Sequence, residues 1–171
     1  MKNIQLDHSR HVPAAARLPL RLVVHDLELA ANVGTLFRVA DALGVERLHL
    51  SGTTPHPPDA RLRKAARATD AHVPWERGDD PLATIAALKA DGWRIVSLEL
   101  TTLSVDVRSL PVAAGDRLCL IVGAEGTGVA QALLDASDAS VHIPMRGHNS
   151  SMNVASACAI ALFELSRHLG A

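Results

Sequence analysis

The sequence predicts an α/β domain, with a mostly parallel sheet and helices on both faces. Short apolar runs that are typical of buried strands alternate along the chain with segments whose apolar residues recur every three or four positions, as on one face of a helix. Two apolar runs end in loops of glycine and small polar residues, at 123–128 and 147–151. Open α/β sheets bind ligands at such places.

The composition describes one globular domain. The 171 residues are 48% hydrophobic and 20% charged, which suits a single core. Aromatic residues make up only 2%, so aliphatic side chains must fill the core and few rings remain on which single-stranded bases could stack. The formal net charge of -1 gives no overall attraction to nucleic acid. Any RNA contact must therefore be local.

Several features indicate a cytoplasmic protein that has no membrane partner. Cys119 and Cys158 lie in apolar runs and are predicted to be buried thiols in a reducing compartment. Charged residues such as Lys2 and Asp7 interrupt the region where a signal peptide would need an apolar core. The longest uncharged run, 147–163, is too short and too polar to span a bilayer.

In chain order, an N-terminal arm (1–18) is expected before a first strand (20–24) and a helix (32–44). Asn32 suits the N-terminal cap of this helix, and Gly44 suits the left-handed residue at its end. The predicted buried face comprises Val33, Leu36, Phe37, Ala40 and Leu43. Arg38 lies off that face, where it is either a solvated helix residue or a functional one.

The next segment carries a cluster of positive charge. A second strand (45–50) and a proline-rich loop (53–58) precede a short helix. Four cations fall within seven residues of this helix: Arg61, Arg63, Lys64 and Arg67. Such a cluster can neutralise RNA phosphates, and a solvated helix face is the alternative.

The remaining elements continue the alternation. The predicted strands are 72–75, 93–98, 117–122 and 141–143, and the predicted helices are 81–90, 129–136 and 154–169. Pro144 ends the last strand, and Ser151 or Asn153 can cap the final helix. The apolar face of that helix comprises Val154, Ala157, Cys158, Ala161, Leu162, Leu165 and Leu169.

Glycines after the strand 117–122 first suggest a dinucleotide site, but their spacing is G-x-x-G-x-G instead of G-x-G-x-x-G. Glu125 lies among them, where a carboxylate can accept hydrogen bonds from ribose hydroxyls or hold a cationic group. The nine histidines show no metal-site spacing, so no metal is predicted.

Three motifs occur in order along the chain. They are Asn32-x-Gly34-x-x-x-Arg38, Gly123-x-Glu125-x-x-Gly128, and Ile143-Pro-Met145 followed by Ser151-x-Asn153. Together they resemble the SpoU/TrmH family of RNA ribose 2′-O-methyltransferases, within the SPOUT class. The likeness extends from about Leu20 onward.

The resemblance implies one SpoU/TrmH-like domain over 1–171 whose C-terminal part forms a trefoil knot. It also implies a homodimer that binds S-adenosyl-L-methionine, releases S-adenosyl-L-homocysteine and acts on tRNA or rRNA, with the final helix and the helix 32–44 near the dimer interface. The cofactor-binding positions it implies are Leu100, Thr101, Gly123, Ile143, Met145, Ser151 and Met152. The catalytic positions it implies are Asn32, Arg38, Glu125, Ser151 and Asn153.

These residue types suit the implied reaction. A ribose 2′-hydroxyl gains negative charge as it attacks a sulfonium methyl group, and Arg38 would stabilise that charge. Arg38 is a poor base, because deprotonating an arginine at pH 7 costs about 7–9 kcal/mol. Asn32 and Asn153 would orient the ribose, and Glu125 would hold either Arg38 or its own loop.

Two other functions stay open at this point. One is SPOUT-type methylation of an RNA base, which the pair Asn32 and Arg38 disfavours because it is typical of the ribose-methylating branch. The other is a non-catalytic module that binds RNA or the cofactor. Such a module would be expected to lack Arg38 or Asn153, and both are present.

Overall fold

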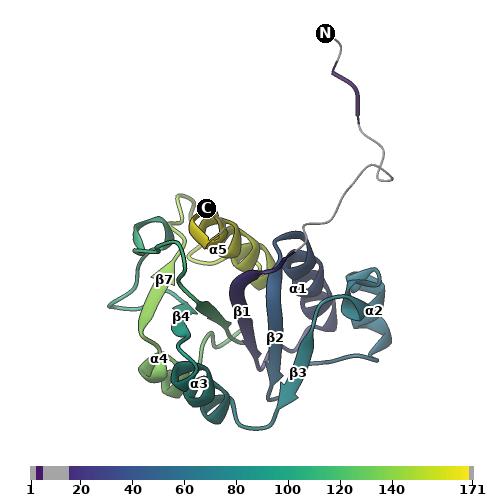
Figure 1. Cartoon of the computed structure of the whole chain (residues 1–171), viewed down its shortest axis with the longest axis horizontal. Coiled ribbons are helices and arrows are strands. Elements are labelled where there is room, and N and C mark those ends of the chain that lie inside the picture. Colours follow the sequence, from purple (N-terminus) through teal and green to yellow (C-terminus); the bar gives the residue numbers. More distant parts are fainter. Residues whose placement is uncertain (1–2, 6–15, 170–171) are drawn as a thin grey trace.

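The computed structural model describes residues 3–5 and 16–169. Of the expected N-terminal arm (1–18), residues 1–2 and 6–15 lie outside the described residues. The described chain forms a seven-stranded sheet in the order β3-β2-β1-β6-β4-β7-β5 (Figure 1). All neighbouring strands run parallel, which confirms the predicted parallel sheet.

The element bounds follow the predicted alternation closely. The strands are β1 (Leu18–His25), β2 (Val45–Ser51), β3 (Trp75–Gly78), β4 (Arg94–Leu98), β5 (Val105–Asp106), β6 (Leu118–Val122) and β7 (Ala139–His142). The helices are α1 (Ala30–Ala42), α2 (Ala60–Ala66), α3 (Pro81–Ala90), α4 (Gln131–Ala136) and α5 (Val154–Leu169), with short 3-10 helices η2 (Thr69–Ala71) and η3 (Val107–Ser109).

Helices cover both faces of the sheet, as predicted. On one face α1, α2 and α5 pack against the sheet and share a large apolar core with it, to which the fully buried Leu22, Phe37 and Leu162 belong. On the other face α3 and α4 cover a smaller core that includes Ile85 and Ile121. Figure 1 shows α3 and α4 together, apart from α1, α2 and α5.

The sheet order brings distant loops to one edge. Central β6 pairs with β1 from Leu118 to Val122, and with β4 on its other side from Leu118 to Ile121. All five residues of β6 are buried. Because the strands are parallel, the loops after β1, β4, β6 and β7 all leave from the same edge, where α/β folds place their sites.

Gly34, which belongs to the first sequence motif, serves helix packing. A Cβ atom at this position would lie 2.3 Å from the backbone oxygen of Leu62 on α2. A side chain there would force α1 and α2 apart. The absence of a side chain at Gly34 therefore lets the basic helix α2 pack closely against the helix that carries Asn32 and Arg38.

Several predicted boundaries were wrong. Asn32 does not cap α1: the helix begins two residues earlier, after Leu29, and the Asn32 side chain bonds elsewhere. The third strand is 75–78 instead of 72–75, because Pro74 has no N–H for the strand ladder and only its carbonyl pairs, with the N–H of Leu48. The first strand begins at Leu18, inside the expected arm.

Two further differences lie in the C-terminal half. The two-residue strand β5 was not predicted, because so short a segment has no periodicity. The helix expected from Val129 begins at Gln131, since the backbone of Ala130 is not helical, with a ψ of 140°. By contrast, Asn153 caps α5 as expected: its Oδ1 accepts hydrogen bonds from the N–H groups of Ala155 and Ser156.

The two cysteines are free and buried, which confirms the prediction for both thiols. Burial raises the pKa of the Cys119 thiol to about 12 and also raises the pKa of Cys158. Within the described part of the chain, no helix combines the length and the apolar character that crossing a bilayer requires.

Candidate active site

A cavity of about 1050 Å³ opens at the carboxyl edge of the sheet. Most of its lining comes from the carboxyl ends of three strands and the loops that follow them: 98–100 at β4, 122–128 at β6, and 142–145 with 147–154 at β7. Leu29 and Asn32 add the start of α1. Segments that are far apart in sequence thus meet around one space, as expected for a ligand site in an open α/β sheet.

Glu125 ties the loop after β6 to the start of α1. Its carboxylate accepts hydrogen bonds from the N–H groups of Glu28 at 3.1 Å and Leu29 at 3.3 Å, and from the Asn32 side-chain amide at 3.0 Å. These donors belong to the first turn of α1 and the residues just before it. A carboxylate at a helix N-terminus satisfies free N–H groups and interacts favourably with the helix dipole.

The surroundings of Glu125 favour its charged form. Burial acts to raise the pKa of the Glu125 carboxyl, but the hydrogen bonds from Asn32, Glu28 and Leu29 outweigh it and leave the pKa below its usual value. Glu125 is therefore an ionised anchor for this loop. It does not contact Arg38, so the expectation that it might hold Arg38 gives way to the alternative that it holds a loop.

Asn32 and Asn153 extend this anchor across the cavity rim. The Asn32 Oδ1 accepts a hydrogen bond from the Asn153 side-chain amide at 3.0 Å, while Asn153 also caps α5. Glu125, Asn32 and Asn153 thus form a hydrogen-bonded chain, named below the rim network. It joins the start of α1 to the loop after β6 and to the N-terminus of α5, through bonds between residues 93 and 121 positions apart in the sequence.

Glycines let the backbone come close inside the cavity. A Cβ atom at Gly123 would lie 2.1 Å from the Gly128 backbone oxygen. Gly128 itself has a φ of +72°, which L side chains rarely adopt. Gly123 and Gly128 of the second sequence motif are therefore required by the fold of this loop.

Most residues expected to contact the cofactor line the cavity. They are Leu100, Gly123, Ile143, Met145, Ser151 and Met152. Thr101 does not line it. Its backbone N–H donates to Ser104 Oγ at 3.0 Å, and its Oγ1 accepts from the N–H of Leu103, so Thr101 shapes the turn after β4.

The expected catalytic residues divide into two groups. Asn32, Glu125, Ser151 and Asn153 line the cavity, whereas Arg38 does not. Arg38 is exposed on α1, six residues after Asn32. That spacing places it about 9 Å further along the helix and roughly 120° around it. The structure thus separates Arg38 from the cavity of its own chain.

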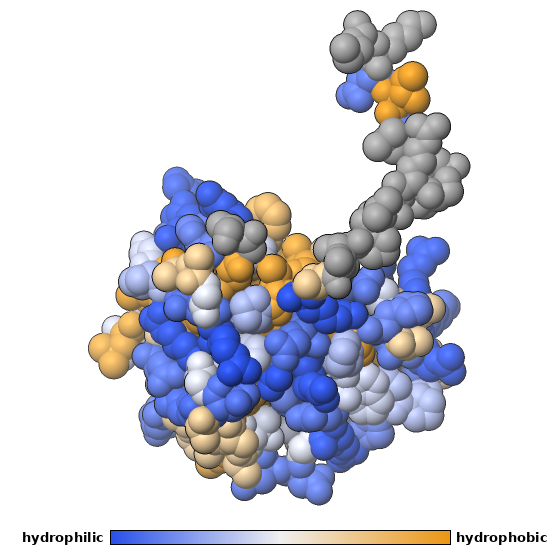
Figure 2. All heavy atoms as spheres, in the orientation of Figure 1, coloured by the Kyte–Doolittle hydropathy of each residue, from blue (hydrophilic) through white to orange (hydrophobic). Residues whose placement is uncertain are grey.

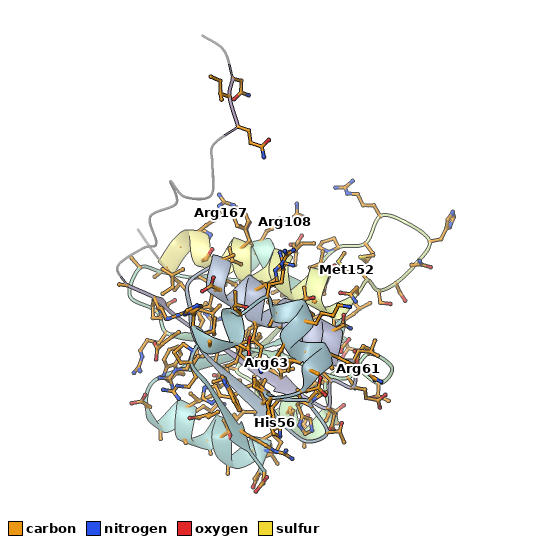
Figure 3. All side chains as sticks on the ribbon, turned by 90° about the vertical axis from the view of Figure 1, so that its right-hand side faces the viewer. His56, Arg61, Arg63, Arg108, Met152 and Arg167 are labelled. Atoms are coloured by element: carbon orange, nitrogen blue, oxygen red, sulfur yellow. The ribbon has the colours of Figure 1, made fainter. Side chains whose placement is uncertain are left out.

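The four cations of the basic helix are all exposed, on or just after α2. Arg63 lies 3.5 Å from Asp70, and α2 packs against α1. Figure 3 shows Arg61 and Arg63 on the face turned to the viewer, with Met152 of the cavity further along the same side of the molecule. This surface presents positive charge beside the carboxyl edge.

Glu99 and His142 line the cavity but were missed by sequence reasoning. His142 Nδ1 lies 2.9 Å from Ser104 Oγ, which links β7 to the turn after β4. Both residues sit at the carboxyl end of a strand, and that position alone could have marked them. Among the residues that the structure describes, no group of three or more histidine, cysteine, aspartate or glutamate side chains could hold a metal ion.

The chain is similar in sequence to known RNA methyltransferases. The chain is 31% identical over 144 residues to the 23S rRNA (guanosine(2553)-2′-O)-methyltransferase RlmP of Bacillus subtilis, covering 84% of this chain and 56% of that protein. It is 36% identical over 149 residues to an uncharacterized tRNA/rRNA methyltransferase of Mycobacterium tuberculosis, covering 81% of this chain and 50% of that one. The chain thus spans about half the length of these relatives.

Solved structures share the fold as well. An AdoMet-bound rRNA methyltransferase from Sinorhizobium meliloti matches with a TM-score of 0.83 and 28% identity, covering 95% of this chain and 62% of that one. A structure described as giving insights into the 2-OH methylation of C/U34 on tRNA matches with a TM-score of 0.76 and 28% identity, covering 87% of this chain and 95% of that one. Residues 19–163 match the SpoU rRNA Methylase family. The chain therefore belongs to that family.

Proposed function

We propose that this chain methylates a ribose 2′-hydroxyl of tRNA or rRNA with S-adenosyl-L-methionine as the methyl donor. The observation that carries the proposal is the rim network of Glu125, Asn32 and Asn153 at the mouth of a cavity lined by three loops. The names of the relatives support it, since one is a 2′-O-methyltransferase and another has AdoMet bound.

The cavity suits S-adenosyl-L-methionine in its chemistry. Leu100, Ile143 and Met152 offer apolar surface for an adenine ring, and the glycine-rich segment 123–128 offers backbone groups at close approach. When bound, the cofactor supplies an electrophilic methyl group on a sulfonium. The carboxylates of Glu99 and Glu125 suit its net positive charge.

The rim network would hold the nucleotide that reacts. Amide groups of Asn32 and Asn153 can bond a ribose hydroxyl, and each is already oriented by a second hydrogen bond, Asn32 by Glu125 and Asn153 by the N-terminus of α5. Side chains fixed in this way orient a substrate at low entropic cost. Ser151 lies at the same rim and adds a further hydroxyl.

Arg38 would stabilise the negative charge that grows on the 2′-oxygen. Because Arg38 lies outside the cavity of its own chain, we propose that it acts at the cavity of a second copy in a homodimer.

Two features support a homodimer built on α1 and α5. Ile160 and Phe163 of α5 are 45% and 59% exposed, and Figure 2 shows hydrophobic surface gathered near α5 and α1. Light scattering that gave a monomer of 18.1 kDa at micromolar concentration would contradict the homodimer.

We also propose that the C-terminal part of the chain forms a trefoil knot. Strand β7 lies between β4 and β5, which are consecutive in the chain, so the connection 99–104 runs past the carboxyl end of β7. The segment 143–153 that leaves β7 then returns to α5 beside β1 and α1. Threading of this segment through the loop 99–117 is the path that we propose.

RNA would approach along the exposed cations of α2, which can neutralise phosphates beside the rim. The cytoplasm is the proposed location, because tRNA and rRNA are modified there in bacteria. Two free, buried thiols suit this reducing compartment.

Mapping ribose methylation in RNA from cells with and without the gene tests the proposal. We expect one 2′-O-methyl mark to disappear and to return when purified protein and S-adenosyl-L-methionine are added to the unmodified RNA. Loss of a methylated base instead would favour base methylation. Unchanged RNA together with cofactor binding would favour a non-catalytic module. Calorimetry with a chelator should still show cofactor binding, because the proposed contacts use backbone groups and apolar side chains and need no metal.

A further inference from the structure

Glu99 stands where the three loops of the cavity meet, and none of the three sequence motifs includes it. It follows β4 directly, and its backbone N–H donates to the carbonyl oxygen of Val141 on β7 at 2.9 Å. Its side-chain Oε1 accepts the N–H of Leu100 at 2.9 Å, and its Oε2 accepts the N–H of Val129 at 3.0 Å. One residue thus joins the loops after β4 and β6 to the strand β7.

Gly128 makes this contact possible. A Cβ atom on Gly128 would lie 2.2 Å from Glu99 Oε2, so any side chain there would displace the carboxylate. Gly128 also exchanges two backbone hydrogen bonds with Ala124, at 2.9 and 3.0 Å, and its oxygen lies against Gly123. The Glu99 carboxylate therefore fixes the backbone that packs on Gly123, at the floor of the cavity.

The chemistry of the contact requires a full-length carboxylate. The N–H groups of Leu100 and Val129 meet different oxygens of the Glu99 carboxylate, and a glutamine amide offers an oxygen at only one of these two places. Aspartate has two oxygens but is one methylene shorter, so it cannot reach both Leu100 and Val129 from the same backbone position. Hydrogen bonds to an ionised acceptor are the stronger kind, and a partner left free in a partly buried site costs further free energy.

We propose that Glu99 is a positioning residue of the cofactor site, which holds the loops after β4 and β6 at the spacing that S-adenosyl-L-methionine requires. This inference rests on the proposed function, because it takes the cavity as the cofactor site. Glu99 acts through the backbone at Leu100 and Val129. Its loss should therefore weaken cofactor binding and leave the methyl-transfer step largely unchanged once the site is filled.

Calorimetry of Glu99→Gln and Glu99→Asp with S-adenosyl-L-methionine tests the proposal. We expect both variants to bind at least about tenfold more weakly, which corresponds to about 1.4 kcal/mol. The KM for the cofactor should rise by a similar factor, while kcat at saturating cofactor stays within about threefold. Glu99→Asp keeps the negative charge, so it separates the bridging geometry from charge alone.

Asp80→Ala is the matched control, since asparagine would still cap the helix. The Asp80 carboxylate also accepts two backbone N–H groups, from Leu82 at 2.9 Å and Ala83 at 3.1 Å, but it caps α3 away from the cavity. This variant should lower the thermal midpoint to a similar extent and bind the cofactor within about twofold of the parent protein. Equal loss of affinity in Asp80→Ala and Glu99→Gln would overturn the proposal, because global destabilisation would then explain both.

The remaining outcomes are also decisive. A parent protein that fails to bind the cofactor would overturn the proposed function and this inference with it. Binding by the parent protein with near-normal affinity in either Glu99 variant would overturn the inference alone. If the variants do not fold, hydrogen exchange on the parent protein replaces them. Cofactor should slow exchange at the amides of both Leu100 and Val129, and protection of one alone would overturn the bridge.

Discussion

Phe37 and Arg38 are neighbours on α1 and have opposite surroundings. Phe37 is fully buried between the helix and the sheet. Arg38 is exposed and makes no hydrogen bond or ion pair with any residue that the structure describes. One helix therefore belongs to the core on one face and carries a candidate catalytic side chain on another. Changes on the two faces should affect different properties, stability on the first and activity on the second.

The largest effect should follow truncation on the core face. Phe37→Ala removes a fully buried ring and leaves a cavity, so we expect the free energy of unfolding to fall by about 3–5 kcal/mol. Phe37→Leu, which keeps most of the volume, should cost far less. Urea unfolding followed by circular dichroism measures both. A loss below about 1 kcal/mol in the alanine variant would show that the core around α1 is less tightly packed than described.

On the other face, Arg38→Ala should lower turnover by ~10²-fold or more, or about 2.7 kcal/mol in the barrier, because Arg38 would stabilise charge present only in the transition state. Cofactor affinity should stay almost unchanged, and the free energy of unfolding should move by less than about 0.5 kcal/mol. Arg38→Lys should rescue little, since lysine lacks the planar fork.

Single-turnover methylation of the cognate RNA, with cofactor binding measured separately, checks the prediction for Arg38. Near-normal turnover in the alanine variant would make Arg38 a solvated helix residue. Phe37 and Arg38 would then differ only in burial, and the exposed face of α1 would have no role in turnover at Arg38.

Asn153 combines both properties in one side chain. Asn153→Ala removes the cap of α5, which should cost about 1 kcal/mol of stability, and also breaks the bond to Asn32. Asn153→Asp keeps an oxygen that caps the helix but loses the amide donor to Asn32. We therefore expect aspartate to restore stability without restoring turnover. Thermal unfolding and methylation assays on the two variants separate the effects. Full activity in Asn153→Asp would show that turnover does not need the hydrogen bond from Asn153 to Asn32.

The smallest effect concerns pH and Glu125. Its folded-state pKa lies below the ordinary value of 4.5, so its ionised form stabilises the native state. This contribution is fully present above pH 4.5 and is lost as the pH falls through the lower, folded-state pKa. It is small because solvent screens an exposed carboxylate. In urea unfolding at several pH values, Glu125→Gln should be slightly less stable than the parent protein near pH 7, and the two profiles should converge as the pH falls through that acidic window.

Local patterns in the sequence predicted much of the fold. Helix α3 was predicted at its observed bounds, 81–90, because Pro81 marks its start and Gly92 its end. The buried strand β6 was within one residue, because a short apolar run leaves few alternatives. In contrast, β5 has two residues and no pattern, and its existence depends on pairing with β7.

The site was predicted less completely, because its roles depend on contacts between distant residues. Asn32 looked like a helix cap, but its partners are Glu125 and Asn153, 93 and 121 positions away. Glu99 lies outside the motifs, and its role became visible only when Val129 was placed beside it. Arg38 was identified by resemblance, and no local pattern could tell that its side chain lies outside the cavity.

The acidic lining of the cavity has a consequence for product release. Glu99 and Glu125 line it, and its described lining residues include no lysine or arginine. Methyl transfer turns a sulfonium into a neutral thioether, so the spent cofactor has one positive charge fewer than the fresh one. In the proposed cofactor site, the two carboxylates would stabilise the fresh form more than the spent form. We therefore expect the chain to exchange product for fresh cofactor readily and to resist inhibition by accumulating S-adenosyl-L-homocysteine.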